Sequence, residues 1–245
     1  MAVLVTRPQP DNEATARALR ARGLEVVLAP MLRFEPVELS EDLGADHAAI
    51  LVTSANALRA IEAQLVESAI FKLPLFAVGE HTASEARRLG FSEVVSADGD
   101  AGKLRDRVRR TLKAKKGARL LYLAGADLAR DLAGELAEHG FDVVIRTTYR
   151  MMALSSLPRV ACDAFAANQI EAILHYSQRT ARAFLEAARA DGVEISALAV
   201  PQCCISANVA AILREAGATR VLAAASADEN GLFGALERAL RPGLA

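Results

Sequence analysis

At several places in this sequence, small polar residues lie between a short apolar run and a segment whose apolar residues recur at the spacing of a helix. The clearest case begins with an apolar run at residues 50–52, continues through Thr53, Ser54, Ala55 and Asn56, and then places apolar residues every three or four positions. This pattern predicts a parallel strand that leads directly into a helix. The first N–H groups of a helix are unpaired and carry roughly half a positive charge, so such a junction can bind a phosphate or a carboxylate. The expected chemistry is anion binding.

The same kind of junction recurs along the chain. Residues 171–184 repeat the pattern of residues 48–61 with a constant shift of 123 positions, which carries Ser54 to Ser177. Capping of helix N-termini by Ser54, Thr82 and Ser177 is the structural alternative for each residue taken singly. The candidate binding residues at all of these junctions are Arg7, Ser54, Ala55, Asn56, Gly79, His81, Thr82, Ser177, Ser206 and Asn208.

No residue pattern of a common catalytic or cofactor site is present. The sequence has no Walker A segment, no G-x-G-x-x-G after its first apolar run, no H-E-x-x-H and no C-x-x-C. We therefore expect neither a metal ion nor a nucleotide or organic cofactor. Among the dispersed histidines, His175 falls in an expected strand and is interpreted as a core residue, and His139 is expected at the surface, whereas His81 stays a candidate.

Composition and charge narrow the class of protein. The chain of 245 residues is 52% hydrophobic, contains no Trp and has a net charge of −1. These proportions are typical of a globular α/β protein and unlike those of a general nucleic-acid binder. No apolar stretch has the length of a membrane span or the form of a signal peptide. Cys162, Cys203 and Cys204 lack metal-ligand spacing and are expected to be free thiols. We expect a cytoplasmic protein with no nucleic-acid or membrane partner.

Alternating strand and helix patterns predict parallel sheets with helices on both faces. The pattern that starts at residues 2–6 restarts at residues 118–125, after a solvated surface segment at residues 113–117, and matched segments lie 117, 123 and 127 positions apart. A diverged duplication would produce such offsets. We expect two flavodoxin-like, doubly wound units of about five strands each. Ligands bind at the carboxyl ends of strands in such sheets, so the polar junctions are expected to form a site shared by the two halves.

Tyr149 adds a possible proton donor to these binding groups. It is one of three tyrosines and falls in residues 146–158, which we interpret as a connector that follows a strand. A phenol is protonated at neutral pH and can donate a proton or a hydrogen bond to a leaving oxygen. Packing of the ring on the connector is the alternative interpretation.

Several stretches together carry a family resemblance: VLVTRP at the start, LVTSANALRA, VGEHTASEARRLGF, Tyr149 in its connector, and ILHYSQRTARAFL. Across essentially the whole chain they resemble the uroporphyrinogen-III synthase family. The resemblance implies two α/β domains that are joined by a two-stranded linker, because the chain crosses between them twice. The implied ranges are 1–34 plus 155–245 for one domain, 40–147 for the other, and 35–39 and 148–154 for the linkers.

The resemblance also implies a reaction. Hydroxymethylbilane, a linear tetrapyrrole with eight carboxylates, loses its terminal hydroxyl as water. The resulting azafulvene closes through a spiro intermediate to uroporphyrinogen III, with ring D inverted and without any metal or organic cofactor. The family's tyrosine and threonine match Tyr149 and Thr82, which are expected to be catalytic, and its serine matches Ser177. The family commonly has a glycine and threonines where this chain has residues 206–208, which is a departure in the second half.

Arg7 and Arg130 each lie near an expected helix start, so we expect them to pair with substrate carboxylates. Two other functions remain open from the residues alone. One is a non-catalytic two-domain binding protein for a small anionic ligand, which would give Tyr149 no chemical task. The other is a glycosyl- or phosphate-handling transferase, whose motifs are missing. We further expect a monomer that receives hydroxymethylbilane from hydroxymethylbilane synthase.

Overall fold

The computed structural model describes residues 1–39, 46–64, 69–112 and 118–241. The surface segment expected at residues 113–117 lies outside them. The chain forms two compact units: unit one consists of Met1–Phe34 and Met152–Ala245, and unit two consists of Glu35–Met151.

Unit one is built on a five-stranded parallel sheet in the order β11-β10-β9-β1-β2. Taken in chain order, the strands run 2-1-3-4-5, which is the flavodoxin-like order. The strand β1 is buried along its whole length, as expected for an uninterrupted apolar run in a parallel sheet. The strands are β1 (Ala2–Val5), β2 (Glu25–Leu28), β9 (Ile170–His175), β10 (Gln202–Cys204) and β11 (Val221–Ala223).

Helices cover both faces of this sheet. The helices α1 (Asp11–Arg20) and α10 (Glu229–Leu240) pack on one face, and α7 (Gln178–Ala190) and α9 (Ala207–Glu215) pack on the other. Two shorter helices complete the unit, α6 (Arg159–Ala166) and α8 (Glu194–Ala199). Adjacent Cys203 and Cys204 belong to the cores on opposite faces, as strand alternation requires, and burial raises the pKa of both thiols to about 12.

Unit two carries the second sheet, in the order β3-β8-β7-β4-β5-β6. All strands from β8 to β6 in that order are parallel. The strand β3 is antiparallel to β8. The Val37 N–H donates to the Thr148 carbonyl, and the Leu154 N–H donates to the Met31 carbonyl. Residue numbers therefore rise along one strand while they fall along the other. The strands are β3 (Leu32–Pro36), β4 (Ala49–Val52), β5 (Leu75–Ala77), β6 (Val94–Ser96), β7 (Arg119–Gly125) and β8 (Asp142–Ala153).

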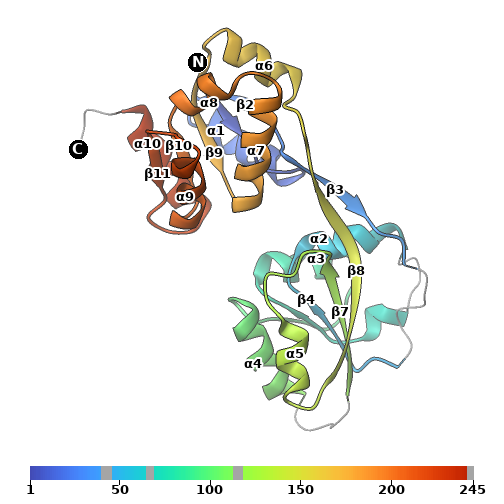
Figure 1. Cartoon of the computed structure of the whole chain (residues 1–245). Coiled ribbons are helices and arrows are strands. Elements are labelled where there is room, and N and C mark those ends of the chain that lie inside the picture. The colour runs from blue at the N-terminus through green and yellow to red at the C-terminus, as the bar shows by residue number, and fades with distance from the viewer. Residues whose placement is uncertain (40–45, 65–68, 113–117, 242–245) are drawn as a thin grey trace. The chain divides into compact units, whose positions relative to one another are not determined.

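Helices also cover both faces of the second sheet (Figure 1). The apolar sides of α2 and α3 form one core with the sheet, and those of α4 and α5 form the other. The helical elements are α2 (Ala55–Ile61), the 3-10 turns η1 (Glu62–Gln64) and η2 (Ala69–Lys72), α3 (Glu80–Arg88), α4 (Ala101–Thr111) and α5 (Leu132–Ala137). The mixed α/β fold with two parallel-dominated sheets is therefore the predicted fold class.

The internal repeat of the sequence is distributed over both sheets. In chain order the first repeat supplies β1, β2, β4, β5 and β6, and the second supplies β7, β8, β9, β10 and β11. In space, one sheet has the order β2-β1-β9-β10-β11 and the other contains the run β8-β7-β4-β5-β6. Apart from β3, each sheet therefore takes two strands from one repeat and three from the other, and each strand occupies the place of its repeat partner.

The connector expected around Tyr149 is a strand instead. The strand β8 continues from Asp142 to Ala153, so Tyr149 lies inside the strand and not beyond its end. Both edges of β8 are occupied, since β7 pairs with one and β3 with the other. Such pairing supplies backbone hydrogen bonds over the whole segment, and the run Thr147-Thr148-Tyr149 consists of residues that favour strands.

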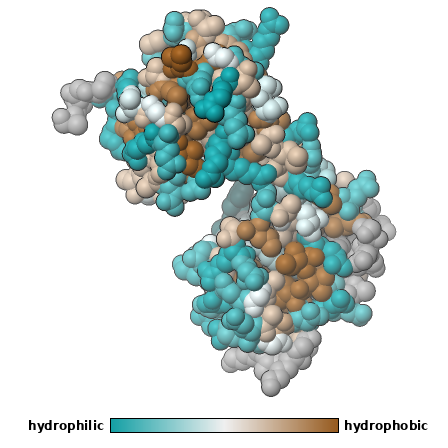
Figure 2. Space-filling view, viewed as in Figure 1, coloured by the Kyte–Doolittle hydropathy of each residue, from teal (hydrophilic) through white to brown (hydrophobic). Residues whose placement is uncertain are grey.

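The surface offers few large apolar side chains. Among the described residues, only six large hydrophobic side chains are exposed. Figure 2 shows hydrophilic residues with hydrophobic patches between them on both units. No helix within the described ranges is long and apolar enough to cross a membrane.

His175 is a core residue, in agreement with its expected place in a strand. It is fully buried at the end of β9, and its Nε2 lies 2.8 Å from Oε1 of Gln202. The amide nitrogen of Gln202 donates to the carbonyls of Ala197 and Val200, which leaves Oε1 as the acceptor and makes the imidazole Nε2–H the donor. Burial lowers the pKa of His175 to about 4, so the ring is neutral at physiological pH.

This burial predicts a pH dependence of stability. Between pH 6.5 and pH 4 the unfolded chain binds a proton at this imidazole that the folded chain excludes, so acidification destabilises the fold by up to about 3 kcal/mol through this group alone. In His175→Gln, whose amide can still donate to Gln202, the free energy of unfolding should fall less over the same pH range. Urea denaturation at pH 7 and pH 4 measures both values. Equal pH losses in the wild type and the variant would contradict the assignment.

Candidate functional site

A β-bulge sets the position of Tyr149 at the end of β7. In the parallel pair of β7 and β8, Ala124 lies opposite Thr147 but Gly125 lies opposite Tyr149, so Thr148 is an extra residue in β8. The buried Thr148 hydroxyl donates to the Ala124 carbonyl at 3.2 Å. A bulge reverses the facing of the side chains that follow it, and Tyr149 accordingly packs against the core under α2 and α3.

The Tyr149 ring lies directly beside Gly125. A Cβ atom built on Gly125 would meet Tyr149 Cζ at 2.7 Å and the phenol oxygen at 2.9 Å. Only a residue without a side chain leaves this space to the ring. The tip of the phenol is therefore held at the carboxyl end of a central strand, which is where ligands bind in doubly wound sheets.

A second tyrosine, which the sequence analysis does not single out, lies at the same edge. The Tyr122 hydroxyl is 2.9 Å from Oγ1 of Thr53, and the residue is only 3% exposed. Burial raises the pKa of Tyr122, the hydrogen bond to Thr53 opposes the shift, and charge on Tyr149 would raise it further. Tyr122 therefore stays protonated beside Tyr149. The only signal in the sequence is its rarity as one of three tyrosines.

The starts of α2 and α3 follow the neighbouring strands β4 and β5. Ser54 is the N-cap of α2 and accepts a hydrogen bond from the Asn56 N–H at 3.2 Å, while Ala55 is buried. Gly79 is the extended N-cap residue of α3 and provides no side-chain cap. Behind it, His81 is exposed and Thr82 is buried within the first turn. The parallel strands bring both helix starts to the same edge of the sheet as Tyr149.

The matching junctions of unit one are also capped helix starts. Ser177 and Thr180 form a reciprocal capping box at the start of α7, with the Thr180 N–H donating to Ser177 Oγ at 3.0 Å. Ser206 caps α9 through a longer bond of 3.4 Å from the Val209 N–H, and Asn208 is exposed in the first turn. The strands β9 and β10 are neighbours, so both helix starts lie at one edge.

Arg7 is tied into a polar network at this edge of unit one. Its guanidinium donates to Glu229 at 3.2 Å and to Asp11 at 3.2 Å, and it lies 4.8 Å from the centre of the Tyr176 ring. The hydroxyls of Thr15 and Tyr176 donate to the same Glu229 oxygen at 2.5 and 3.1 Å. Burial raises the pKa of Tyr176, so its hydroxyl remains a donor.

Arg130 has an internal partner of its own. It is partly exposed directly before the α5 N-cap residue Asp131, and its guanidinium pairs with both carboxylate oxygens of Glu135. Hydrogen bonding to Glu135 raises the pKa of Arg130. Both arginines that are expected to bind carboxylates therefore hold carboxylates of the protein, and an external carboxylate has to share or replace these partners.

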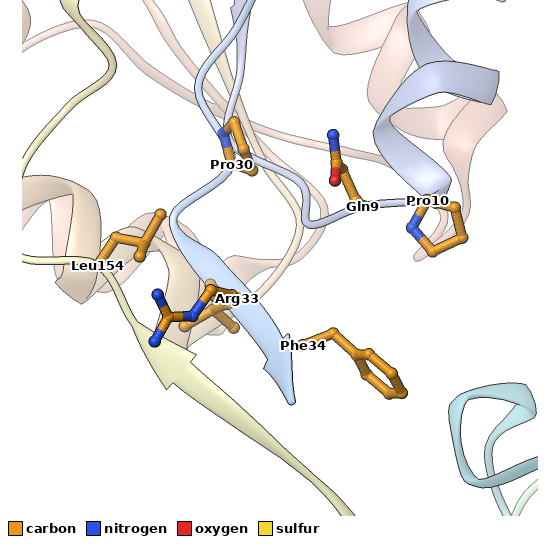
Figure 3. A pocket seen from close by; sticks show the side chains of 7 residues that line it. Gln9, Pro10, Pro30, Arg33, Phe34 and Leu154 are labelled. Atoms are coloured by element: carbon orange, nitrogen blue, oxygen red, sulfur yellow. The ribbon is translucent and has the colours of Figure 1, made fainter. Parts of the chain in front are cut away.

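A pocket of about 380 Å³ lies in unit one beside the residues that follow β1 and β2 (Figure 3). Its lining is mostly apolar, with the guanidinium of Arg33 and the amide of Gln9 as polar exceptions, a composition typical of small-molecule sites. In Figure 3, Gln9 and Phe34 lie on one side and Leu154 and Arg33 on the other. The described residues contain no group of His, Cys, Asp and Glu that could hold a metal ion.

Comparison with known proteins identifies one family. The sequence model of a family described as "Uroporphyrinogen-III synthase HemD" matches residues 13–234. The fold is similar to that of uroporphyrinogen-III synthetase from Helicobacter pylori, with 17% identity, a TM-score of 0.68 and coverage of 96% of this chain and 98% of that one. A mutant uroporphyrinogen III synthase from the extremely thermophilic bacterium Thermus thermophilus has 17% identity and a TM-score of 0.56, with 99% and 100% of the chains covered. A search of curated proteins gave no match.

The capping geometry predicts unequal costs for two matched serines. Ser177→Ala removes a short cap bond and one half of a capping box, so it should lower the free energy of unfolding by about 1 kcal/mol. Ser206→Ala removes only the long bond to Val209 and should cost about 0.5 kcal/mol or less. Urea denaturation of both variants makes the comparison. A larger loss for Ser206→Ala would show that the cap geometry does not set the cost.

Proposed function

The chain belongs to the uroporphyrinogen-III synthase family, and from this premise we propose how its own residues carry out the reaction. The family match over residues 13–234 carries the functional conclusion. The protein is a cyclising hydro-lyase that converts hydroxymethylbilane to uroporphyrinogen III with loss of water and inversion of ring D. No observation favours the alternative of a non-catalytic binding protein.

We propose that the starts of the helices bind the carboxylates of the substrate. The helices α3, α7 and α9 begin at the carboxyl ends of β5, β9 and β10, and each offers N–H groups with a partial positive charge. The proposed binding residues are Arg7, Ser54, Ala55, Asn56, Gly79, His81, Arg130, Ser177, Ser206 and Asn208. Main-chain donors suit a flexible polyanion, because their positions are fixed by the fold before the substrate arrives.

The pocket in Figure 3 suits one substituted pyrrole. Its proline, leucine and phenylalanine side chains can contact the faces of a flat ring, and Arg33 offers a positive charge to an acetate or propionate group. A volume of about 380 Å³ falls within the range of small-molecule sites. This chemistry supports a binding role for this edge of unit one.

Tyr149 is the proposed donor for departure of the hydroxyl group. In this step the C–O bond of the terminal hydroxymethyl group breaks as the phenol protonates the leaving oxygen, and water departs. The pyrrole nitrogen supplies the electron pair that forms the exocyclic double bond, and its N–H proton returns to the phenolate, which leaves a neutral azafulvene and a neutral Tyr149. Thr82, buried in the first turn of α3, is proposed to support the reacting end of the substrate through its hydroxyl.

Orientation is the main task of the protein. The azafulvene can close unaided, so the enzyme has to hold ring D in the geometry of the spiro intermediate. Positioning and preorganised donors can contribute several kcal/mol to such a step without a covalent partner. We also propose that the protein acts as a cytoplasmic monomer and receives its substrate from hydroxymethylbilane synthase; the three free cysteines support a reducing compartment.

The isomer composition of the product tests the reaction. Hydroxymethylbilane generated in situ should yield predominantly the type III isomer with this protein, and the type I isomer without it, after oxidation to porphyrins and separation by chromatography. A type I product indistinguishable from that of the protein-free control would reject the function.

Tyr149→Phe tests the proposed donor. Loss of the hydroxyl should lower kcat by at least about 10-fold, because a general acid typically contributes more than that, while KM changes little. Initial rates at several substrate concentrations separate the two parameters, and the melting temperature checks the fold. A wild-type kcat in a folded variant would remove the assigned role.

A further inference from the structure

The backbone around Tyr149 is fixed from both sides of β8. The Ala126 N–H donates to the Tyr149 carbonyl at 3.0 Å on the β7 side, and the Val37 N–H donates to the Thr148 carbonyl at 2.7 Å on the β3 side. The Thr148 hydroxyl adds its bond to the Ala124 carbonyl. With these bonds in place, the bulge cannot shift along β7 without losing backbone pairing, so the direction in which the Tyr149 side chain leaves β8 is set by the sheet.

The remaining freedom of Tyr149 is the rotation of its side chain, and Gly125 limits it. The ring occupies the space in which any other residue at position 125 would carry its Cβ, since the nearest ring atoms lie 2.7 to 3.1 Å from that position. Real Cβ atoms essentially never approach other atoms to less than 3.0 Å. A methyl group at this place would therefore displace the phenol.

We propose that Gly125 is a positioning residue for Tyr149, and that its missing side chain determines where the phenol meets the leaving oxygen. The proposal rests on the role of Tyr149 given above. Gly125 does not contact the reacting atoms. Its effect is that it has no side chain in the space that the Tyr149 ring occupies. A displacement of about 1 Å at a reacting group can cost a large factor in rate, so a single methyl group at this position is sufficient to matter.

The backbone of Gly125 itself does not require glycine. Its φ lies outside the left-handed region that side chains avoid, unlike that of Gly90 or Gly140. Alanine can therefore adopt the same backbone conformation without strain, and it fits a strand better than glycine does. The effect of Gly125→Ala should come from the contact with the Tyr149 ring and not from the local fold.

A double-mutant cycle tests this proposal in the full-length enzyme. Gly125→Ala should lower kcat roughly 10-fold or more with a small change in KM. In a Tyr149→Ala background, where no ring is left to displace, Gly125→Ala should cause no further loss. If Gly125→Ala lowers kcat by the same factor in both backgrounds, its role is not to position Tyr149. Should Gly125→Ala alone fail to fold, recovery of folding in the double variant would support the steric contact, and failure of both would reject it.

Near-UV circular dichroism gives a readout that does not depend on activity. The chain has no Trp and three tyrosines, so the tyrosine band reports on few side chains. Gly125→Ala should change this band in the wild-type background and leave it unchanged in the Tyr149→Ala background. If Gly125→Ala leaves the tyrosine band of the otherwise wild-type protein unchanged, the proposal is overturned, even if Tyr149→Phe has a low kcat. If Tyr149→Phe is fully active, the role of Tyr149 fails separately, and the spectrum still decides whether Gly125 positions the ring.

Gly234→Ala is the matched control. Gly234 lies in α10 of unit one, where a new Cβ would meet only the guanidinium of Arg238 at 3.8 Å, an ordinary contact. The same substitution at this glycine should leave kcat and the tyrosine band unchanged. A loss of rate equal to that of Gly125→Ala would show that glycine replacement acts through general destabilisation.

Discussion

Parallel strand pairing is the constraint on which the rest of this structure depends. In a parallel sheet every strand ends at the same edge, and the helix that follows it must begin there. The N–H groups at the starts of α2, α3, α7 and α9 therefore collect at sheet edges without any special sequence motif. The sequence needs only small residues and caps at these places, which explains why a protein for a polyanionic substrate shows no conspicuous catalytic pattern.

The groups that we propose to bind substrate also stabilise the fold. Ser54, Ser177 and Ser206 cap helices, and Arg7 and Arg130 are paired with carboxylates of the protein. An arginine held between carboxylates has a fixed position, but its charge is largely compensated. Main-chain N–H groups at helix starts are also fixed in position, and the side-chain cap occupies one of them in each of α2, α7 and α9 and none in α3. This difference favours the backbone over the arginines as the principal source of carboxylate binding.

The internal repeat shows that sequence repeats and structural units need not coincide. Apart from the edge strand β3, each sheet combines two strands of one repeat with three of the other, and the spatial order of these five strands is the same in both. A strand can pair with any neighbouring strand whose apolar side chains face the same core. Matching strands of the two repeats have the same apolar pattern, so either can take the same place in a sheet. Because each sheet contains strands from both repeats, the chain passes from one unit to the other twice, in β3 and in β8. The Tyr149 bulge lies in one of these crossing strands, where β8 is paired on both sides.

From the sequence we could predict most strands and helices, the capped polar junctions and the α/β class, because these depend on residues within a few positions of one another, but not the continuation of β8 through Tyr149. The two units were expected from the internal repeat, and the family from resemblance along the chain. Apolar period, caps and the opposite facing of Cys203 and Cys204 are local properties. The tertiary structure alone decided that Tyr149 lies within β8, that a bulge turns it toward Gly125, that Tyr122 bonds to Thr53, and that Arg7 is held by Glu229. These contacts join residues that lie from 24 to 222 positions apart. Register and side-chain contacts at such separations are set by which strands become neighbours, and no local pattern in the chain encodes that choice.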